Sequence, residues 1–141
     1  LLIFLIFFQI ILGAFVSGLD AGKIYQTWPL MNYSYFPDEI NLVSLKDFFN
    51  FENHALVQFY HRNLAYLITI YLIIISIYVL INKIKKLYLS LFLVIFFLFI
   101  QVVLGIVTLT SNLNLYLSSA HQICGLVLTL SVINLYYNHI N

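Results

Sequence analysis

Two histidines in this 141-residue chain each stand near the start of a long apolar segment. His61 belongs to the stretch Val-Gln-Phe-Tyr-His-Arg at 57–62, and His121 opens a second apolar run sixty residues later. If both runs are helices that point the same way, the two imidazoles reach the same depth. A neutral imidazole is a good iron ligand, and two of them on facing helices suit the axial positions of a haem. The alternative is that each histidine makes only a polar contact between helices.

The composition places these segments in a membrane. Hydrophobic residues make up 63% of the chain and charged residues 8%, whereas soluble domains carry about 25% charged residues. We therefore predict an all-α, polytopic membrane four-helix bundle made of two similar helical hairpins, with an outer loop at 19–56. The first segment starts without Met or a basic flank, so we expect a fragment with a clipped first helix and not a signal peptide. The predicted spans, each near the required length of about 20 residues, are 1–18, 57–81, 87–109 and 116–137.

The placement of charge predicts the orientation of the bundle. Lys83, Lys85 and Lys86 crowd the short link between the second and third spans, and the positive-inside rule puts such a link in the cytoplasm or its organellar equivalent. The outer loop and the turn at 111–114 then lie outside. A net charge of +1 without a basic stripe gives no reason to expect a nucleic-acid partner. A single cysteine, Cys124, leaves no disulfide framework or thiolate cluster to expect.

Helix rise gives the depth of each histidine. His61 precedes Lys83 by 22 residues, which at about 1.5 Å per residue is roughly 33 Å, a full hydrocarbon thickness. His61 therefore belongs near the outer interface, and so does His121. His139 follows His121 by 18 residues, or roughly 27 Å along a helix, so it cannot bind the same iron. His54 lies before the second span, where we expect a solvated or hydrogen-bonded loop residue.

A short motif repeats along the chain. The sequence Gln-x-x-Leu-Gly occurs at 9–13 and again at 101–105, at an offset of 92 residues, and this repeat predicts the two hairpins. Within each motif the glutamine and the glycine share a helix face, where a small residue lets a backbone or a flat ligand approach. Four residues after each histidine comes another small residue, Ala65 or Gly125, which we expect to leave room for the edge of a macrocycle. The alternative is plain helix packing through small residues.

Polar residues beside His61 have more than one interpretation. Arg62 could pair with a haem propionate, since a guanidinium matches a carboxylate, or it could extend to lipid headgroups. Gln58 lies one turn before His61 and could orient or cover the pocket, but it has no acid–base function. In the outer loop we expect a short interfacial helix that starts near 37–39 and continues to Phe49. The loop aromatics fit a membrane belt or a lid over the pocket.

Iron with two histidine ligands has no open position for a substrate, so a haem bound in this way carries electrons or supports the structure. Two further function classes stay open at this point. One is a cytochrome b-type electron-transfer module that passes electrons to a quinone. The other is a scaffold bundle without haem, whose histidines make helix contacts only.

Several stretches together resemble the haem A synthase family, in its mitochondrial and alphaproteobacterial type. The resemblance extends over nearly the whole chain in order, and the Cys pair found in the outer loops of some bacterial relatives is absent. It depends on Gly-Ala-Phe-Val-Ser-Gly-Leu-Asp-Ala-Gly at 13–22, Thr-Trp-Pro-Leu-Met at 27–31, Phe-Asn-Phe-Glu-Asn at 49–53, the stretch at 57–62, the motif at 101–105 and the pair His121-Gln122.

The resemblance implies a function for the bundle. Family members have eight spans in two similar halves, and they oxidise the C8 methyl group of haem O to the formyl group of haem A for cytochrome oxidase assembly. This chain resembles the C-terminal half, which holds haem b between two histidines, here His61 and His121. The N-terminal half binds haem O and uses a glutamate three residues before a histidine. Gln58 occupies that position here, so we expect no catalytic residue in this half.

The resemblance also implies surroundings and partners. It places the protein as a multi-pass protein in the bacterial inner membrane or the mitochondrial inner membrane. The implied partners are haem O, bound through the N-terminal half, together with haem O synthase, an electron acceptor and the lipid bilayer.

Overall fold

The computed structural model describes residues 1–37, 39–40 and 46–141, and in this part it contains helices and no strands. The all-α, four-helix fold predicted from the sequence is confirmed. The α-helices are α1 (Leu2–Gly18), α2 (His54–Ile81), α3 (Tyr88–Thr110) and α4 (Leu115–Ile140), and the short 3-10 turns are η1 (Ala21–Lys23), η2 (Asp47–Phe49) and η3 (Lys85–Leu87).

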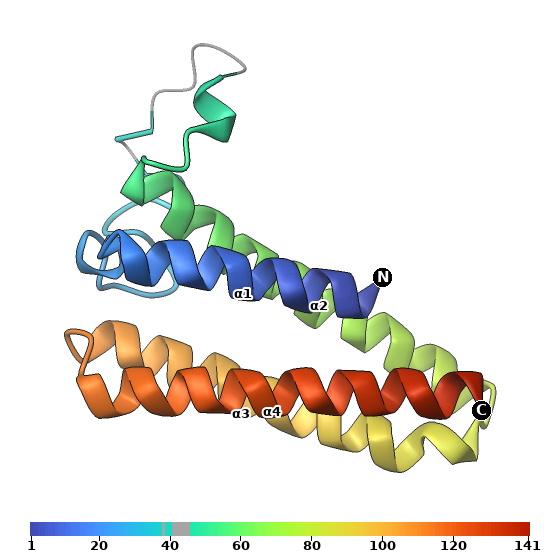
Figure 1. The fold of residues 1–141 in the computed structure, drawn as a ribbon. Helices are drawn as coiled ribbons and strands as arrows, with labels where there is room; N and C mark the ends of the chain where they lie inside the picture. The colour runs from blue at the N-terminus through green and yellow to red at the C-terminus, as the bar shows by residue number, and fades with distance from the viewer. Residues whose placement is uncertain (38, 41–45) are drawn as a thin grey trace.

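The four helices form two hairpins. Helix α1 packs mainly against α2, and α3 packs mainly against α4, while contacts between the hairpins are fewer. The hairpins lie as two layers that approach each other at the end carrying the α2–α3 link and separate toward the outer loop (Figure 1). Helices α2 and α4 both run from the outer loop toward that link. The histidine-bearing helices are therefore parallel.

Among the described residues, a buried apolar cluster joins the layers at the end of the bundle that carries the α2–α3 link. On α2 its members begin at Ile68 and on α4 at Leu128, in each case seven residues after the histidine. On α3 the cluster ends at Leu98, just before the second glutamine motif. The members of this cluster on α2 and α4 therefore begin about two turns after each histidine. Its members are Leu2, Ile6, Ile68, Leu72, Val79, Leu87, Leu91, Val94, Leu98, Leu128, Val132 and Leu135.

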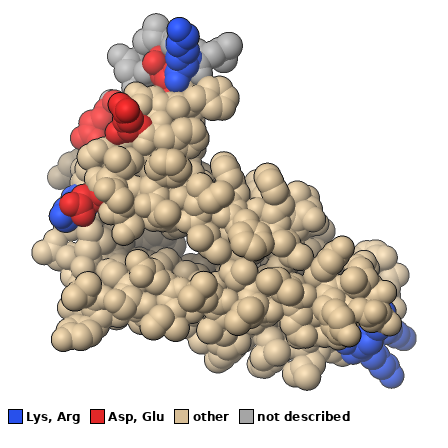
Figure 2. All heavy atoms as spheres, in the orientation of Figure 1, with Lys and Arg blue, Asp and Glu red and all other residues tan. Residues whose placement is uncertain are grey.

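The surface fits a lipid environment. Three helices are long and apolar enough to cross a membrane, and α1 is an apolar helix of 17 residues. Large apolar side chains are exposed along every helix, for example Phe4, Leu67, Phe99 and Leu126. Figure 2 shows charged side chains only at the two ends of the face in view, with an uncharged band between them. Because that band has no charged side chains and many exposed apolar ones, it fits the hydrocarbon part of a lipid bilayer.

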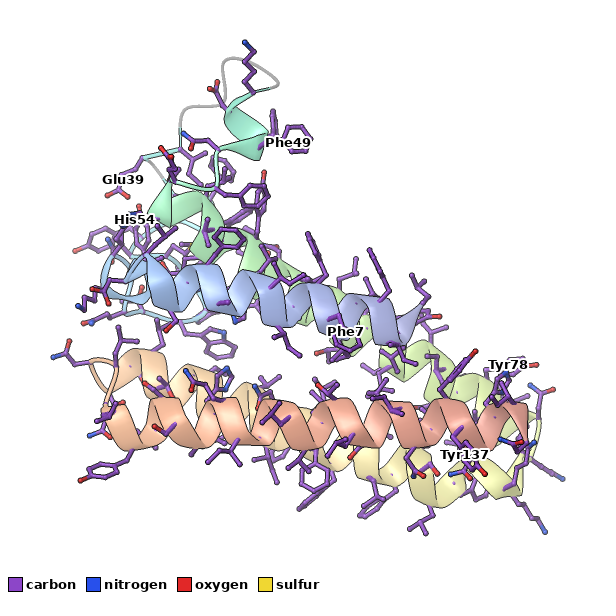
Figure 3. The ribbon with its side chains drawn as sticks, viewed as in Figure 1. Phe7, Glu39, Phe49, His54, Tyr78 and Tyr137 are labelled. Carbon is purple, nitrogen blue, oxygen red and sulfur yellow. The ribbon has the colours of Figure 1, made fainter. Side chains whose placement is uncertain are left out.

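The second helix starts earlier than the sequence predicted. The expected span began at residue 57, but α2 begins at His54, because the side chain of Asn53 accepts a hydrogen bond from the Leu56 amide at 3.0 Å and caps the helix. His54 is therefore a first-turn helix residue and not a loop residue. Figure 3 shows it beside the outer loop that carries Glu39 and Phe49, with Tyr78 and Tyr137 at the opposite end.

The outer loop folds over the start of α2. A second apolar cluster contains Tyr25, Met31 and Ile40 of the loop together with Ala55 and Leu56 of α2. The interfacial helix expected between 37 and 49 involves residues 38 and 41–45, which lie outside the described residues. In the described part of that stretch the structure has the single turn η2. The histidine level thus lies between two apolar clusters, one below it and one in the loop above it.

Candidate functional site

His61 and His121 occupy matching places in the two hairpins. Asn53 caps α2 and Asn114 caps α4, so each histidine comes about two turns after a fixed helix start. Both side chains are partly buried, and each contacts the preceding helix of its own hairpin. The structure therefore places, at the same end of the bundle, the two residues that the sequence proposed as ligands.

The first imidazole lies against helix α1. The side-chain nitrogen of Gln9 is 3.2 Å from Nδ1 and 3.4 Å from Nε2 of His61, and it donates a hydrogen bond to the His61 carbonyl at 3.0 Å. A Cβ atom added to Gly13 would lie 3.2 Å from the His61 Cε1 atom. The ring thus lies against the Gln9 amide and against the backbone of Gly13, which is one turn further along α1.

The second imidazole has the same kind of contacts on helix α3. The side-chain nitrogen of Gln101 is 3.3 Å from Nε2 of His121, and a Cβ atom added to Gly105 would lie 3.0 Å from its Cε1 atom. A Cβ at either distance would require the ring to give by a few tenths of an ångström, and glycine avoids this at both places. We refer to the sets Gln9–Gly13–His61 and Gln101–Gly105–His121 as the first and second histidine cradles.

The small residue after His121 has a different neighbour from the one expected. A Cβ atom added to Gly125 would lie 3.3 Å from the Gln101 side-chain nitrogen. Gly125 therefore makes room for the amide that touches His121, because the glutamine crosses from α3 to α4 at this level. Its position supports the second histidine cradle directly.

Buried polar atoms without partners gather in the cradles. The side-chain oxygens of Gln9 and Gln101 and the Nδ1 atom of His121 are buried and make no hydrogen bond. Leaving such an atom unpaired costs about 1 to 3 kcal/mol, so the cradles contain hydrogen-bonding capacity that the described residues do not use. Two imidazoles with such atoms beside them are a donor set that suits a bis-histidine haem.

Arg62 has a contact set that neither sequence interpretation included. Its guanidinium donates to the carbonyls of Tyr25, Thr27 and Leu30, at 2.9, 2.9 and 3.4 Å. Its Nε atom is buried without a partner. Arg62 therefore holds the outer loop against α2. Its pairing with a haem propionate stays a prediction.

Gln58 and Arg62 donate hydrogen bonds to the same loop carbonyl, that of Tyr25. The Gln58 side-chain nitrogen donates to it at 2.8 Å, and the side chain is almost fully buried. Further along the loop, the Trp28 indole donates to the hydroxyl of Tyr66 at 3.0 Å. Tyr66 lies one turn beyond Arg62 on α2, so the loop extends along the helix past the level of His61. This contact favours a lid over a membrane belt for Trp28.

A pair of contacts joins the hairpins at their outer ends. The Gln26 side chain donates to the Asn112 side chain at 2.8 Å, and a Cβ added to Gly22 would lie 3.0 Å from the Leu113 side chain. Leu113 has a positive φ of 57°, a conformation that costs a residue with a side chain about 1 to 2 kcal/mol. These four residues, which we call the outer latch, connect the loop of one hairpin to the turn of the other.

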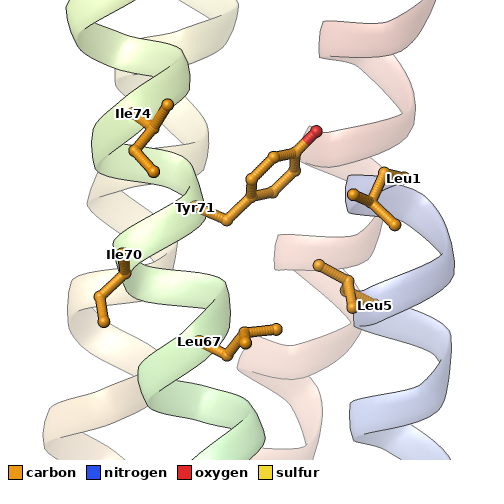
Figure 4. Close-up of a pocket in the computed structure, with 6 residues that line it drawn as sticks. All are labelled: Leu1, Leu5, Leu67, Ile70, Tyr71 and Ile74. Atoms are coloured by element: carbon orange, nitrogen blue, oxygen red, sulfur yellow. The ribbon is translucent and has the colours of Figure 1, made fainter.

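Two cavities lie elsewhere in the described part of the chain. An apolar groove of about 410 Å³ lies between α1 and α2, lined by Leu1, Leu5, Leu67, Ile70, Tyr71 and Ile74 (Figure 4). It begins six residues beyond His61 along α2, and a smaller hollow of about 290 Å³ lies beside Phe15 at the outer end of α1. Neither includes a residue of the histidine cradles. His139, in the last turn of α4, is remote as expected.

The sequence alone indicated some of these residues and missed others. The repeated motif pointed to both glutamines and both glycines, but not to their contact with the histidine rings. The sequence indicated the Asn caps and the outer latch less clearly than it indicated the glutamines and glycines. An Asn followed by an apolar run is a known helix start, whereas nothing local to Gln26 or Leu113 indicates a partner in the other hairpin.

Comparisons with known proteins give a consistent result. The model of the COX15-CtaA family, described as cytochrome oxidase assembly protein, matches residues 1–133. The Heme A synthase of Pelagibacter ubique is 42% identical over 127 residues, which cover 90% of this chain and 37% of that protein. The Heme A synthase of Maricaulis maris is 40% identical over 133 residues, covering 92% and 38%. The chain thus spans less than two fifths of these relatives, and no solved structure matches it significantly.

Proposed function

Because the chain belongs to the COX15-CtaA family of cytochrome oxidase assembly proteins, we propose that it is the haem b-binding half of a haem A synthase. The observation that supports this proposal is the pair of matched histidine cradles at one level of the bundle. The full-length enzyme oxidises the C8 methyl group of haem O to the formyl group of haem A. In relatives of greater length, named Heme A synthase, this chain corresponds to one part.

His61 and His121 are the residues that would hold haem b. When bound there, haem b would supply one-electron transfer. The glycines of the two cradles admit the rings, and the apolar cluster below the site keeps water from entering between the hairpins. The outer loop, held by Arg62 and Gln58, covers the site from the other side.

The oxidation itself belongs to the part of the full-length protein outside this chain. Gln58 is an amide and has no proton to transfer near neutral pH, so it cannot replace the carboxylate implied for the substrate half. We propose that haem O binds in that half, while the residues of this one would hold the haem b. An electron acceptor and haem O synthase are the further proposed partners.

The proposed location is the bacterial inner membrane or the mitochondrial inner membrane. Lys83, Lys85 and Lys86 lie at one end of the bundle, and all five acidic residues of the chain belong to the segment 19–56 at the other. This asymmetry puts the lysine end in the cytoplasm or matrix. The histidine cradles then lie near the outer face.

The test uses the full-length protein purified in detergent. We expect a low-spin bis-histidine haem b spectrum, and we expect the double variant His61→Ala, His121→Ala to lose it. A double variant with normal haem content would exclude the assignment.

A second measurement separates the proposal from a cytochrome b-type electron-transfer module. Cells that carry the full-length gene are expected to convert haem O into haem A. Reversible haem reduction without any haem A formation would assign the bundle to the electron-transfer class instead.

A further inference from the structure

We propose that the hydroxyl of Thr108 is a further binding group of the cofactor site and donates a hydrogen bond to a propionate carboxylate of haem b. This inference rests on the proposed haem b function. It concerns a residue of α3 that lies outside the repeated Gln-x-x-Leu-Gly motif.

The Thr108 hydroxyl is buried and has no hydrogen-bond partner among the described residues. Only 8% of the residue is exposed, and its Oγ1 atom is unpaired. The other threonines of the helices, Thr69, Thr110 and Thr129, each donate to the carbonyl four residues earlier, at 2.8, 3.0 and 2.8 Å. This is the usual way in which a helical threonine satisfies its hydroxyl. Thr108 departs from it, so its donor is free for another partner.

Thr108 lies on the face of α3 that forms the second histidine cradle. Gln101, Gly105 and Thr108 follow one another at intervals of four and three residues, so they form one row along the helix. A Cβ atom added to Gly105 would lie 3.0 Å from the His121 Cε1 atom. Because α3 runs from the α2–α3 link toward the outer end, Thr108 lies about one turn outward of the level of this ring.

The outer latch covers Thr108 from the other side. The Leu113 amide donates to the Thr108 carbonyl at 3.0 Å, and a Cβ added to Gly22 would lie 3.0 Å from the Leu113 side chain. Thr108 is therefore placed between the second histidine cradle and the outer latch. At this end of the bundle the two layers separate (Figure 1).

The charges of haem b indicate which of its groups would meet the hydroxyl. Haem b has two propionate carboxylates on one edge, and a carboxylate is costly in an apolar environment unless it is paired or hydrogen-bonded. The apolar cluster that contains Ile68 and Leu128 lies on the inner side of the cradles, so the propionate edge belongs on the outer side. A hydroxyl on that side can donate a charge-assisted hydrogen bond to a carboxylate.

The two hairpins differ at this position, which makes packing a poor explanation of the hydroxyl. At the repeat offset of 92 residues, Val16 of the first hairpin corresponds to Thr108. Valine has nearly the same shape as threonine and would leave no unpaired oxygen. The hairpins also differ beside their histidines, where the first has the cation Arg62 and the second has the exposed amide Gln122. Thr108 thus supplies a buried donor in the hairpin that has no cation next to its histidine.

The experiment measures the binding of haem b to the full-length protein after removal of its haem. Thr108→Val keeps the shape and removes the hydroxyl, whereas Thr108→Ser keeps a hydroxyl. We expect the valine variant to bind haem b about 10- to 100-fold more weakly, the effect of losing a hydrogen bond to a charged group. The serine variant should bind nearly as tightly as the unsubstituted protein. Thr110→Val is the matched control on the same helix, because the Thr110 hydroxyl already donates to the Ile106 carbonyl, and it should leave the affinity unchanged.

A modified haem identifies the group that the hydroxyl meets. In the dimethyl ester of haem b both carboxylates are neutral, and a hydrogen bond to a neutral oxygen is about half as strong as one to a carboxylate. The loss of affinity caused by Thr108→Val should therefore fall to a few-fold with the ester. With natural haem b, the propionate bending band of the resonance Raman spectrum should shift in Thr108→Val and stay in place in Thr110→Val.

Three outcomes would overturn the inference. One is an unchanged affinity of the valine variant for haem b. Another is a loss that serine does not restore in protein of normal helical content, which would assign Thr108 to packing. The third is an equal loss with haem b and with its dimethyl ester, which would exclude a carboxylate as the partner. Failure of the proposed function is distinct from all three, since the unsubstituted protein would then show no low-spin bis-histidine haem.

Discussion

Gly13 and Gly105 are the residues against which the two imidazoles rest. At either position a methyl group would approach the ring edge to 3.2 or 3.0 Å, closer than carbon atoms in good contact at about 3.5 to 4.0 Å. Neither glycine has a positive φ, so space and not backbone conformation explains its presence. The absence of a side chain is the property that the site uses.

Substitution of these glycines by alanine should displace the rings. We expect Gly105→Ala to reduce haem content more than Gly13→Ala, because its added methyl group lies closer to the ring. Gly18→Ala is the matched control on α1, since a Cβ at Gly18 meets nothing within 4 Å. The measurement is the haem-to-protein ratio of the purified full-length protein. Equal haem content in all three variants would contradict the cradle geometry.

Arg62 is a charged residue whose hydrogen bonds go to the outer loop. Its three backbone contacts satisfy most of its donors without any carboxylate. The buried Nε atom is one donor left for another partner. A charged group inside a membrane is costly unless it is paired or hydrogen-bonded. The loop carbonyls supply that compensation here.

At the scale of the helices, the two Asn caps determine where the histidine helices begin. Asn114 accepts hydrogen bonds from the amides of Tyr116 and Leu117 at 3.0 and 3.4 Å. Asn53 does the same for Leu56 at the start of α2. Because a helix advances about 1.5 Å per residue, a fixed start also fixes the height of the histidine that follows.

Removal of a cap should destabilise its helix. We expect Asn114→Ala to lower the free energy of unfolding by about 1 kcal/mol, because the first-turn amides lose their acceptor. Asn114→Ser keeps an acceptor and should lose little. Denaturant unfolding of the full-length protein in detergent measures the difference. Identical stability for the alanine and serine variants would argue against capping by Asn114.

At the scale of the whole molecule, the hairpins are joined at both ends and open between. The apolar cluster holds them at the lysine end, and the outer latch holds them at the loop end. The histidine cradles lie in the interval where no buried apolar cluster of the described residues joins the layers. A flat cofactor needs this kind of interval, because close packing would leave it no space.

The distribution of charge predicts how the whole molecule crosses the membrane. Tyr33 is almost fully exposed in the outer loop, and Lys86 lies in the link at the other end. In a Cys124→Ser background of the full-length protein, Tyr33→Cys should react with a membrane-impermeant thiol reagent in intact cells whose outer face is accessible. Lys86→Cys should react only after permeabilisation. The reverse pattern would invert the proposed orientation.

The sequence by itself determined the class of the molecule, its helices and the two histidines, His61 and His121, that stand in matching places of the hairpins. The length of the hydrophobic segments, the placement of charge and the repeated Gln-x-x-Leu-Gly motif are local properties. They can be identified in the sequence without knowing how the helices pack. They sufficed for an all-α membrane bundle of two hairpins and for the prediction that His61 and His121 lie at equal depth. The start of α2 was placed three residues late because the cap of Asn53 was not considered.

Only the tertiary structure decided which side chains meet. Contact of Gln9 and Gln101 with the rings depends on how far each helix is turned about its own axis, and helical periodicity along one segment leaves that angle free with respect to its neighbour. The same holds for Arg62, whose partners are carbonyls more than thirty residues away, and for the outer latch between the hairpins. Every residue has the same backbone carbonyl, so the sequence does not indicate which carbonyl or which neighbouring helix a side chain will contact. Those partners are determined by the packing of the helices in three dimensions.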